Sequence, residues 1–477
     1  MRLNSLFSYL KYDNISPMEL NKNTDIKKIF TIALPLICQQ IFVQLKVYID
    51  RAMLGRVNSD FFSAIGNVLV PYQMVMSMII SICTGTTILI AHNIGAKNED
   101  MYKKYAECSY IGNTVISLIA FFFFFFCSGF LFYIMGVKSP ILELSASYLK
   151  IMSFSYLIFG IYSTSVSITQ GIGLTKIIMI SGIVSSVLNI LLDYILIFGK
   201  FGFPQMEIRG AALASFISIS AAAVVIVLYV FFSKRMPVKL NLKDVIFCKL
   251  NLYKDVLKKG VPTGLEMGLF NIGNFIIIIF LNRIDASAVG IYTLIYSIQL
   301  IPLLFYMGLA QATLTLTGHK TGEGEHVQAV NTGFLALKFS LLFCFIFAVL
   351  FILFPKNIMG IFTNDILFID NSSKYFLVIA ITMFPKATNI IIGHGIRGTG
   401  DTKWMMYTQI FGTIFVIALS YILIFILRIG LMGIFITYLA DESIRSIINT
   451  IRFWKGKDFF RRKIIRRRNE KDADFVI

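Results

Sequence analysis

The stretch NILLDYILIF, residues 189–198, is an apolar segment that carries an amide and a carboxylate four residues apart. It lies in a longer apolar window, about 176–198, and similar windows recur from one end of the chain to the other. A helix needs about 20 consecutive apolar residues to cross a bilayer. The stretch therefore indicates a membrane-spanning helix that holds polar groups at the depth of the hydrocarbon.

The whole chain has the composition of a polytopic membrane protein, since 57% of its 477 residues are hydrophobic. Each apolar run is continuous and too long for a barrel strand, which needs only about ten alternating residues. The sequence predicts an all-α fold with twelve transmembrane helices, at about 28–50, 61–91, 108–135, 143–169, 176–198, 210–232, 259–281, 288–317, 330–354, 373–396, 403–427 and 431–453.

Short motifs recur at one constant separation along the chain. Pro35 aligns with Pro262, the HxxG motif at 92–95 with that at 319–322, and GIGLTK at 171–176 with GTGDTK at 398–403. This separation covers six spans, so we predict two six-helix bundles related by a pseudo-two-fold axis along the membrane normal. We interpret the glycine-rich turns as helix ends and the two histidines as hydrogen-bonded groups rather than metal ligands.

Basic residues are distributed unevenly between the loops on the two sides of the predicted spans. Thirty of the 44 Lys and Arg residues lie on the side of both termini, and nine lie in the opposite loops. The positive-inside rule therefore predicts cytoplasmic termini in a plasma (inner) membrane. The net charge of +18 is explained by this topology, and we expect no nucleic-acid partner.

The same pattern divides the chain into five predicted segments. These are a cytoplasmic N-terminal segment (1–27), the N-terminal bundle (28–232), a basic cytoplasmic linker (233–258), the C-terminal bundle (259–453) and a basic cytoplasmic tail (454–477).

The N-terminal bundle carries acids inside its apolar windows. An ionisable residue at mid-membrane costs about 2.5 to 3.5 kcal/mol, so it usually faces a cavity and binds something. Asn189 and Asp193 are one turn apart and share a helix face. If the first and fifth spans meet, Asp50 adds a second carboxylate, and the pair would take up a proton or a small metal ion. Alternatively, Asp193 caps a backbone or pairs with a nearby base, and Asp50 belongs to the extracellular helix end or is neutralised by Lys46.

The C-terminal bundle has a different set of polar groups: Glu266, Asn271, Asn274, Lys386 and Asn389. Glu266 and Lys386 could form a buried ion pair or part of a substrate site, and both alternatives stay open.

The repeat itself is asymmetric at the acids, because Asp50, Asn189 and Asp193 align with Ile277, Val416 and Ser420.

Near the cytoplasm, the last span carries charges that we expect to form a local salt-bridge network: Asp441, Glu442, Arg445 and Arg452.

Four motifs together resemble the multidrug and toxic compound extrusion (MATE) family over about residues 25–457. They are DxxMLG at 50–55, NILLD at 189–193, GAALAS at 210–215 and RGTGDTK at 397–403. The resemblance implies a secondary antiporter that exports organic, often cationic and amphipathic compounds in exchange for inward H⁺ or Na⁺ by alternating access.

Matched by motif, the resemblance implies a cation site formed by Asp50, Asn189, Asp193 and Ser215, the first three being the ligands if the ion is Na⁺. Glu266 matches an acid of the seventh span. Lys386 stands about where some members carry an acid of the tenth span, and Lys46 beside Asp50 is a further departure, so the coupling ion stays open.

The expected partners are a small organic substrate and the lipid bilayer, with the chain a monomer and no cofactor beyond the coupling ion. We expect no enzymatic activity, because the sequence has no nucleophile–base constellation or metal-ligand spacing. One alternative is a flippase for a lipid-linked sugar or another anionic amphipath, which Lys46 and Lys386 keep open. Another is a receptor or channel without active transport.

Overall fold

The computed structural model describes residues 22–55, 59–248, 250–284 and 286–473, and the regular secondary structure of these residues is helical throughout. The predicted N-terminal segment lies outside them up to residue 21, as do the last four residues of the predicted tail.

The long helices of the first half are α2 (Lys22–Gly55), α3 (Ser59–Gly95), α4 (Glu99–Ile134), α5 (Ile141–Ile172), α6 (Thr175–Phe198) and α7 (Glu207–Phe232). Those of the second half are α9 (Tyr253–Ile284), α10 (Ala286–Gly322), α11 (His326–Leu353), α14 (Phe376–Gly398), α15 (Thr402–Tyr421) and α16 (Leu431–Ala473).

Shorter elements connect the long helices. They are α8 (Leu242–Ile246), the 3₁₀ turn η2 (Leu250–Leu252), α12 (Pro355–Gly360), α13 (Ile366–Ser373) and the π-helical turn η3 (Ile422–Ile426).

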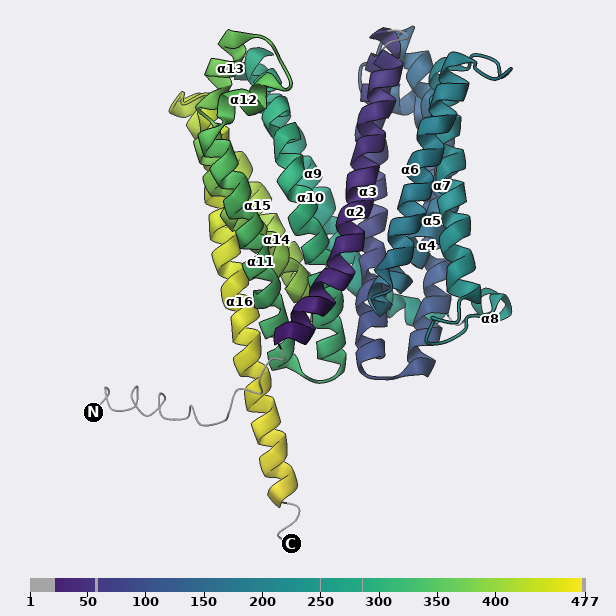
Figure 1. Cartoon of the computed structure of the whole chain (residues 1–477), viewed down its shortest axis with the longest axis vertical. Coiled ribbons are helices and arrows are strands. Elements are labelled where there is room, and N and C mark those ends of the chain that lie inside the picture. The colour runs from purple at the N-terminus through teal and green to yellow at the C-terminus, as the bar shows by residue number, and fades with distance from the viewer. Residues whose placement is uncertain (1–21, 56–58, 249, 285, 474–477) are drawn as a thin grey trace, which may run out of the picture.

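The long helices form two bundles, which we call the N-lobe (α2–α7) and the C-lobe (α9–α16), and Figure 1 shows them side by side. In the N-lobe, α5 packs on α3, α4 and α7, while α6 packs on α2 and α7. In the C-lobe, α14 packs on α10, α11 and α16, and α9 on α15. The lobes meet where α3 packs on α9 and where α10 packs on α2 and α3. The predicted all-α fold of two six-helix bundles is confirmed.

Eleven helices among the described residues are long and apolar enough to cross a membrane. The twelfth long helix, α16, differs because it carries Asp441, Glu442 and Arg445 in its membrane-length part. It also continues to Ala473, well beyond the end of the predicted span at 453.

The paired glycine-rich turns end helices, as predicted. Gly173 follows α5 with φ +96°, and Gly400 lies between α14 and α15 with φ +90°. Both conformations are left-handed, which glycine adopts without a steric penalty. The two glycines occupy aligned positions of the two halves, so the repeat seen in the sequence is also a repeat of backbone geometry.

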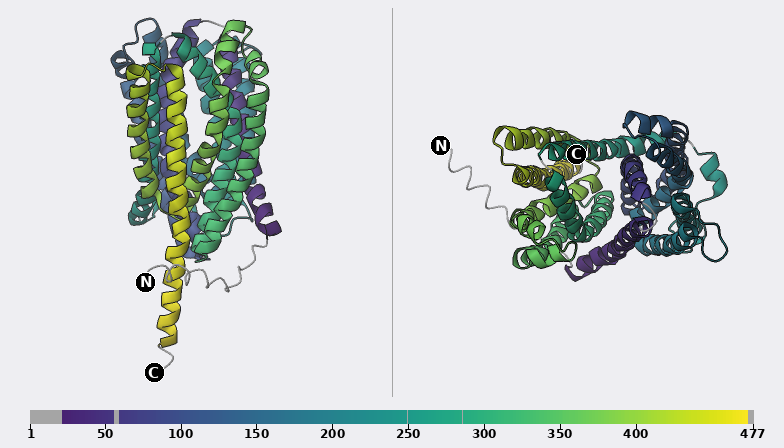
Figure 2. Two further views of the ribbon diagram at one scale, coloured as in Figure 1. Left: turned by 90° about the vertical axis from the view of Figure 1, so that its left-hand side faces the viewer. Right: turned by 90° about the horizontal axis from the view of Figure 1, so that it is seen from above.

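The two ends of the molecule differ in what they carry. Figure 1 shows the start of α2, the end of α16 and the connecting helix α8 at one end, which we call the linker end, and α12 and α13 at the other. The left view of Figure 2 shows the same end of α16 projecting beyond the bundles.

Candidate functional site

Packing of α6 against α2 and α7 brings the predicted N-lobe residues into contact. In the amide orientation that satisfies both of its ends, Asn189 donates to Asp50 Oδ1 at 3.0 Å and to Asp193 Oδ2 at 3.2 Å. Its carbonyl oxygen accepts from the backbone N–H of Ser215 at 3.3 Å and lies 3.4 Å from the Ser215 hydroxyl. Four residues from three helices therefore form one cluster, which we call the acid cluster.

The acid cluster is buried but not fully satisfied. Asn189 and Asp193 have no exposed surface, and Asp50 is half-buried. Asp193 Oδ1 has no hydrogen-bond partner among the described residues. A buried carboxylate oxygen without a partner is costly and rare, so it marks a place where a proton or an ion would be stabilised.

Two further side chains lie beside the acids. Lys46, one turn before Asp50 on α2, interacts electrostatically with both Asp50 and Asp193. Tyr148 of α5 is buried and also interacts electrostatically with both. The sequence had indicated Lys46 from its spacing, whereas nothing in the sequence pointed to Tyr148.

Glu266 in the C-lobe is paired with a residue that the sequence analysis did not choose. Arg397 donates from Nη2 to Glu266 Oε1 at 2.5 Å and from Nε to Oε2 at 3.2 Å. The alternative of a Glu266–Lys386 ion pair is therefore wrong. Lys386 and Arg397 share α14 but are eleven residues apart, which is about 16 Å along a helix.

Lys386 belongs instead to a network with α16. It interacts electrostatically with Glu442, whose Oε2 accepts from Asn389 Nδ2 at 2.8 Å. Asn389 Oδ1 in turn accepts from Asn449 at 2.8 Å. Asn389 thus has partners for both ends of its amide.

The predicted salt-bridge network of the last span forms among Asp441, Glu442 and Arg445 and is buried, but including Arg452 in it was wrong, because Arg452 pairs with Asp401. Arg445 donates to both oxygens of Asp441, with its shortest contact at 2.5 Å, and to Gln409 Oε1 at 2.8 Å. Its Nη2 also lies 3.6 Å from Glu442 Oε1. Asp441, Glu442 and Arg445 are each less than a tenth exposed.

The remaining predicted polar residues do not join one site. Asn271 of α9 donates to Ser77 of α3 at 3.2 Å, which links the two lobes. Asn274 accepts from the Tyr438 hydroxyl at 3.1 Å inside the C-lobe. These contacts account for both residues as packing groups.

The two histidines of the repeated HxxG motif join the lobes near the linker end. His92 of α3 bonds the carbonyl oxygen of Gly398 in the C-lobe at 2.7 Å, and His319 of α10 bonds that of Gly171 in the N-lobe at 2.6 Å. The two histidines are aligned in the repeat and so are the two glycines, so the pair of bonds follows the repeat. The hydrogen-bonded interpretation is confirmed, although the sequence did not reveal that the bonds cross between lobes.

Glycines let the helices approach closely at the same place. A Cβ on Gly95 would lie 2.0 Å from the backbone oxygen of His319, and one on Gly322 would lie 2.0 Å from that of His92. No side chain fits at such distances. We call these four residues the seam.

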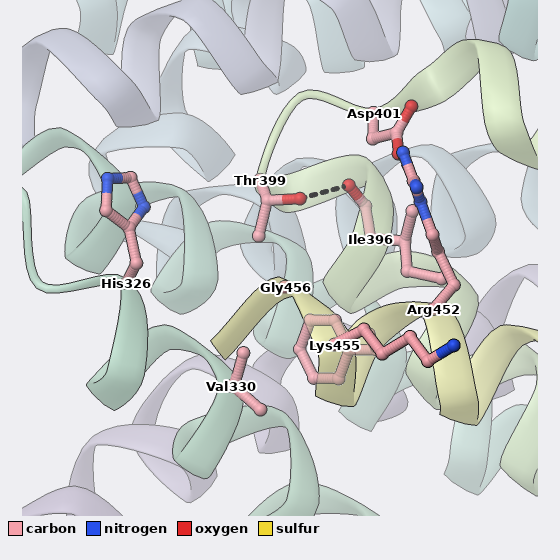
Figure 3. A pocket seen from close by; sticks show the side chains of 9 residues that line it. His326, Val330, Ile396, Thr399, Asp401, Arg452, Lys455 and Gly456 are labelled. Carbon is pink, nitrogen blue, oxygen red and sulfur yellow. Dashed lines mark hydrogen bonds and ion pairs between the residues drawn. The ribbon is translucent and has the colours of Figure 1, made fainter. Parts of the chain in front are cut away.

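A surface pocket lies in the C-lobe near the linker end, between the start of α11, the end of α14 and α16 (Figure 3). Two of its charged lining residues are paired with each other, since Arg452 donates to Asp401 at 2.8 Å. Arg452 also lies over the Trp404 ring at 4.9 Å. The lining contains no residue of the acid cluster, so this pocket is not part of the candidate site.

Comparisons with known proteins agree with this architecture. The sequence model of the MatE family matches residues 35–195 and again 262–422, two ranges related by the same offset as the sequence repeat. The chain is 27% identical over 447 residues to the uncharacterized transporter YisQ of Bacillus subtilis, covering 91% of this chain and 97% of that protein. It is 29% identical over 441 residues to the probable multidrug resistance protein NorM of Thermotoga maritima, covering 90% and 92%.

Solved structures show the same fold at lower identity. A multidrug resistance MATE family transporter in its outward-facing conformation superposes with a TM-score of 0.85 at 20% identity, covering 92% of this chain and 97% of that one. A MOP superfamily transporter from Pyrococcus furiosus, described as having a binding pocket of reversed polarity, gives a TM-score of 0.83 at 20% identity with the same coverage.

Proposed function

The chain belongs to the MATE family of membrane transporters, and from that premise we propose that it is a secondary active antiporter. It exports small organic compounds, cationic and amphipathic, in exchange for inward H⁺ or Na⁺. Several relatives are named multidrug resistance proteins, which supports this class of substrate. The termini and the linker face the cytoplasm of the plasma (inner) membrane, as the excess of basic residues on that side favours.

One observation carries the proposal: Asp193 is fully buried beside the half-buried Asp50, and its Oδ1 has no partner in the part of the chain that the structure describes. Loading the pair with a positive charge removes most of the cost of burying it. If water reaches the two acids more easily in one conformation of the protein than in the other, binding of a cation changes which conformation is favoured. The concentration gradient of the coupling ion drives the exchange, and each tenfold difference across the membrane supplies about 1.4 kcal/mol.

The seam explains how such a preference would change access. Its two histidine bonds and two glycine contacts hold the lobes together near the linker end. Opening toward the cytoplasm requires that both bonds break, and the symmetric placement makes the lobes separate as two units. In this description the two lobes move relative to each other while each bundle stays intact.

The test uses the purified full chain in proteoliposomes with ethidium as the transported dye, while Na⁺ and pH gradients are varied independently. We expect an imposed gradient to drive uphill flux in the wild type, and Asp193→Asn to reduce that flux to the leak of protein-free liposomes. Ser420→Ala, at the aligned position of the C-lobe, is the matched control and should retain flux.

Downhill leakage alone in the wild type would contradict antiport and favour a channel. Gradient-insensitive movement of an anionic lipid analogue, with no ethidium export, would favour the flippase.

A further inference from the structure

Lys46 is a third charged group of the acid cluster, and the proposed transport step does not account for it. It is half-buried on α2, one turn before Asp50, and interacts electrostatically with both acids. All three residues lie in the described part of the chain, yet neither acid forms an ion pair with Lys46 within 4 Å. Lys46 is therefore close enough to influence an ion at the pair without occupying the pair.

The charges of the cluster do not balance. Asp50, Asp193, Lys46 and Tyr148 are the titratable groups that the described residues place together there. With the acids and the lysine ionised and the tyrosine neutral, one net negative charge is left, and a single positive charge neutralises it. Without Lys46 the same pair would need two.

The geometry between the acids also favours a proton over a metal ion. The Asn189 amide nitrogen donates to one oxygen of each acid, so N–H groups already point into the space that a shared metal ion would occupy. A proton needs no such space because it binds to a single carboxylate oxygen, for which Asp193 Oδ1 is available.

We propose that Lys46 is a tethered cation that restricts the acid cluster to one proton per transport cycle and excludes Na⁺. This inference rests on the proposed antiport. A proton from the outer side forms an O–H bond with a carboxylate of the pair, and the same bond breaks when the proton passes to water on the cytoplasmic side. Na⁺ is excluded because it stays a separate charge that would be held beside the Lys46 ammonium group, and like charges repel strongly where the protein is partly dry, whereas a bound proton becomes part of a neutral carboxyl group.

The experiment measures ethidium flux in proteoliposomes for the wild type, Lys46→Met and Lys46→Arg. We expect a pH gradient to drive the wild type and a Na⁺ gradient alone to leave it at the leak rate. In Lys46→Met a Na⁺ gradient alone should drive flux at least about tenfold above wild type, since the repelling charge is gone. Lys46→Arg keeps the charge and should behave as wild type, as should Lys150→Met, which removes an exposed lysine of α5.

The number of coupling ions exchanged per ethidium is read from the ethidium gradient at which net flux stops. One coupling ion per cycle is expected in the wild type and two in Lys46→Met. Na⁺-driven flux in the wild type, or an unchanged ion preference and stoichiometry in Lys46→Met, would overturn the inference.

A second measurement does not depend on folding of the Lys46 variants. Purified wild type equilibrated with ²²Na⁺ should retain no more than Asp193→Asn does, and saturable binding that requires Asp193 would overturn the inference. The results that would overturn this inference can be told from a failure of the proposed antiport. If antiport itself is wrong, no ion gradient drives uphill flux in the wild type.

Discussion

Within the described residues, the N-lobe leaves Asp193 Oδ1 without a partner, whereas the C-lobe gives each of Glu266 and Asp441 an arginine. The two lobes are built from the same repeat, and both bury acids in a membrane-spanning bundle. The difference is in what the acids touch: an amide and a more distant lysine in one lobe, and a forked guanidinium in the other. A balanced buried pair adds a structural constraint, while an unbalanced one retains affinity for a cation.

The aligned positions show how the difference arose within one fold. Glu266 and Arg397 align with Gln39 and Gln170 of the N-lobe, and Lys46 aligns with Gly273 of the C-lobe. The repeat therefore fixes the scaffold, while substitutions at aligned positions decide which lobe can bind a cation.

The largest effect should come from breaking the C-lobe pair. Arg397→Gln leaves Glu266 as an unpaired buried charge, and we expect a loss of about 3–5 kcal/mol in the free energy of unfolding. The double variant Glu266→Gln/Arg397→Gln copies the aligned N-lobe residues and should recover part of that loss. Unfolding in detergent, followed by circular dichroism, measures both. Equal stability of the single and double variants would show that the pair does not matter.

Neutralising a buried charge in the N-lobe should change the free energy of unfolding in the opposite direction. Asp193→Asn removes a buried charge with an unsatisfied oxygen, so we expect stability to rise by up to about 3 kcal/mol. The same unfolding assay tests this, with Ser420→Asn at the aligned position as the control. A less stable Asp193→Asn would mean that the acid is structurally satisfied and would erase the contrast between the lobes.

A smaller effect is expected at the seam, where the two lobes are alike. Gly95→Ala places a Cβ against the His319 backbone, and overpacking of this kind costs about 1 kcal/mol or more. The cost falls only on the conformation closed near the linker end, so spin-label distances between the lobes should lengthen there. Gly322→Ala should act equally, while Gly66→Ala on the same helix as Gly95 has open space and should change nothing.

The smallest effect should come from a pair that is only half-buried, in contrast to the buried ones. Lys103 donates to Asp244 at 2.6 Å and holds the pKa of that carboxyl below its usual value, with Asn241 adding to the shift. A lowered pKa stabilises the fold above the ordinary aspartate value of about 3.9, and this contribution is lost as the pH falls through the lowered value. Unfolding of wild type and Asp244→Asn should therefore converge at acid pH. A difference that persists there would assign the effect to something other than this carboxylate.

The helices, the repeat and the acid cluster were all accessible from the sequence. Apolar windows located the helices, and one offset aligned the glycine turns that the structure places in left-handed conformations. Asn189 and Asp193 were assigned to one face from their spacing, and the condition that the first and fifth spans meet is fulfilled by the contact of α2 with α6. The continuation of α16 to Ala473 was missed, because apolar length measures the span and not the helix.

The partner of Glu266 was beyond such reasoning. Lys386 and Arg397 lie on the same predicted helix, and the sequence offers no measure of their depth relative to α9. The choice between them depends on how α14 sits against α9, and the structure brings Arg397 to the acid. The histidine bonds of the seam were hidden for the same reason, since each joins residues 148 or 306 positions apart.

The sequence by itself determined where the chain crosses the membrane, that it does so in two related halves, and that Asp50 and Asp193 of the first half have no acidic counterparts at the aligned positions of the second. These properties follow from the cost of placing polar groups in hydrocarbon, which acts on each segment separately. Only the tertiary structure decided which charges are paired, which oxygen is left unsatisfied and where the lobes touch. Those properties depend on contacts of a few ångströms between helices, and the packing of whole bundles sets such distances.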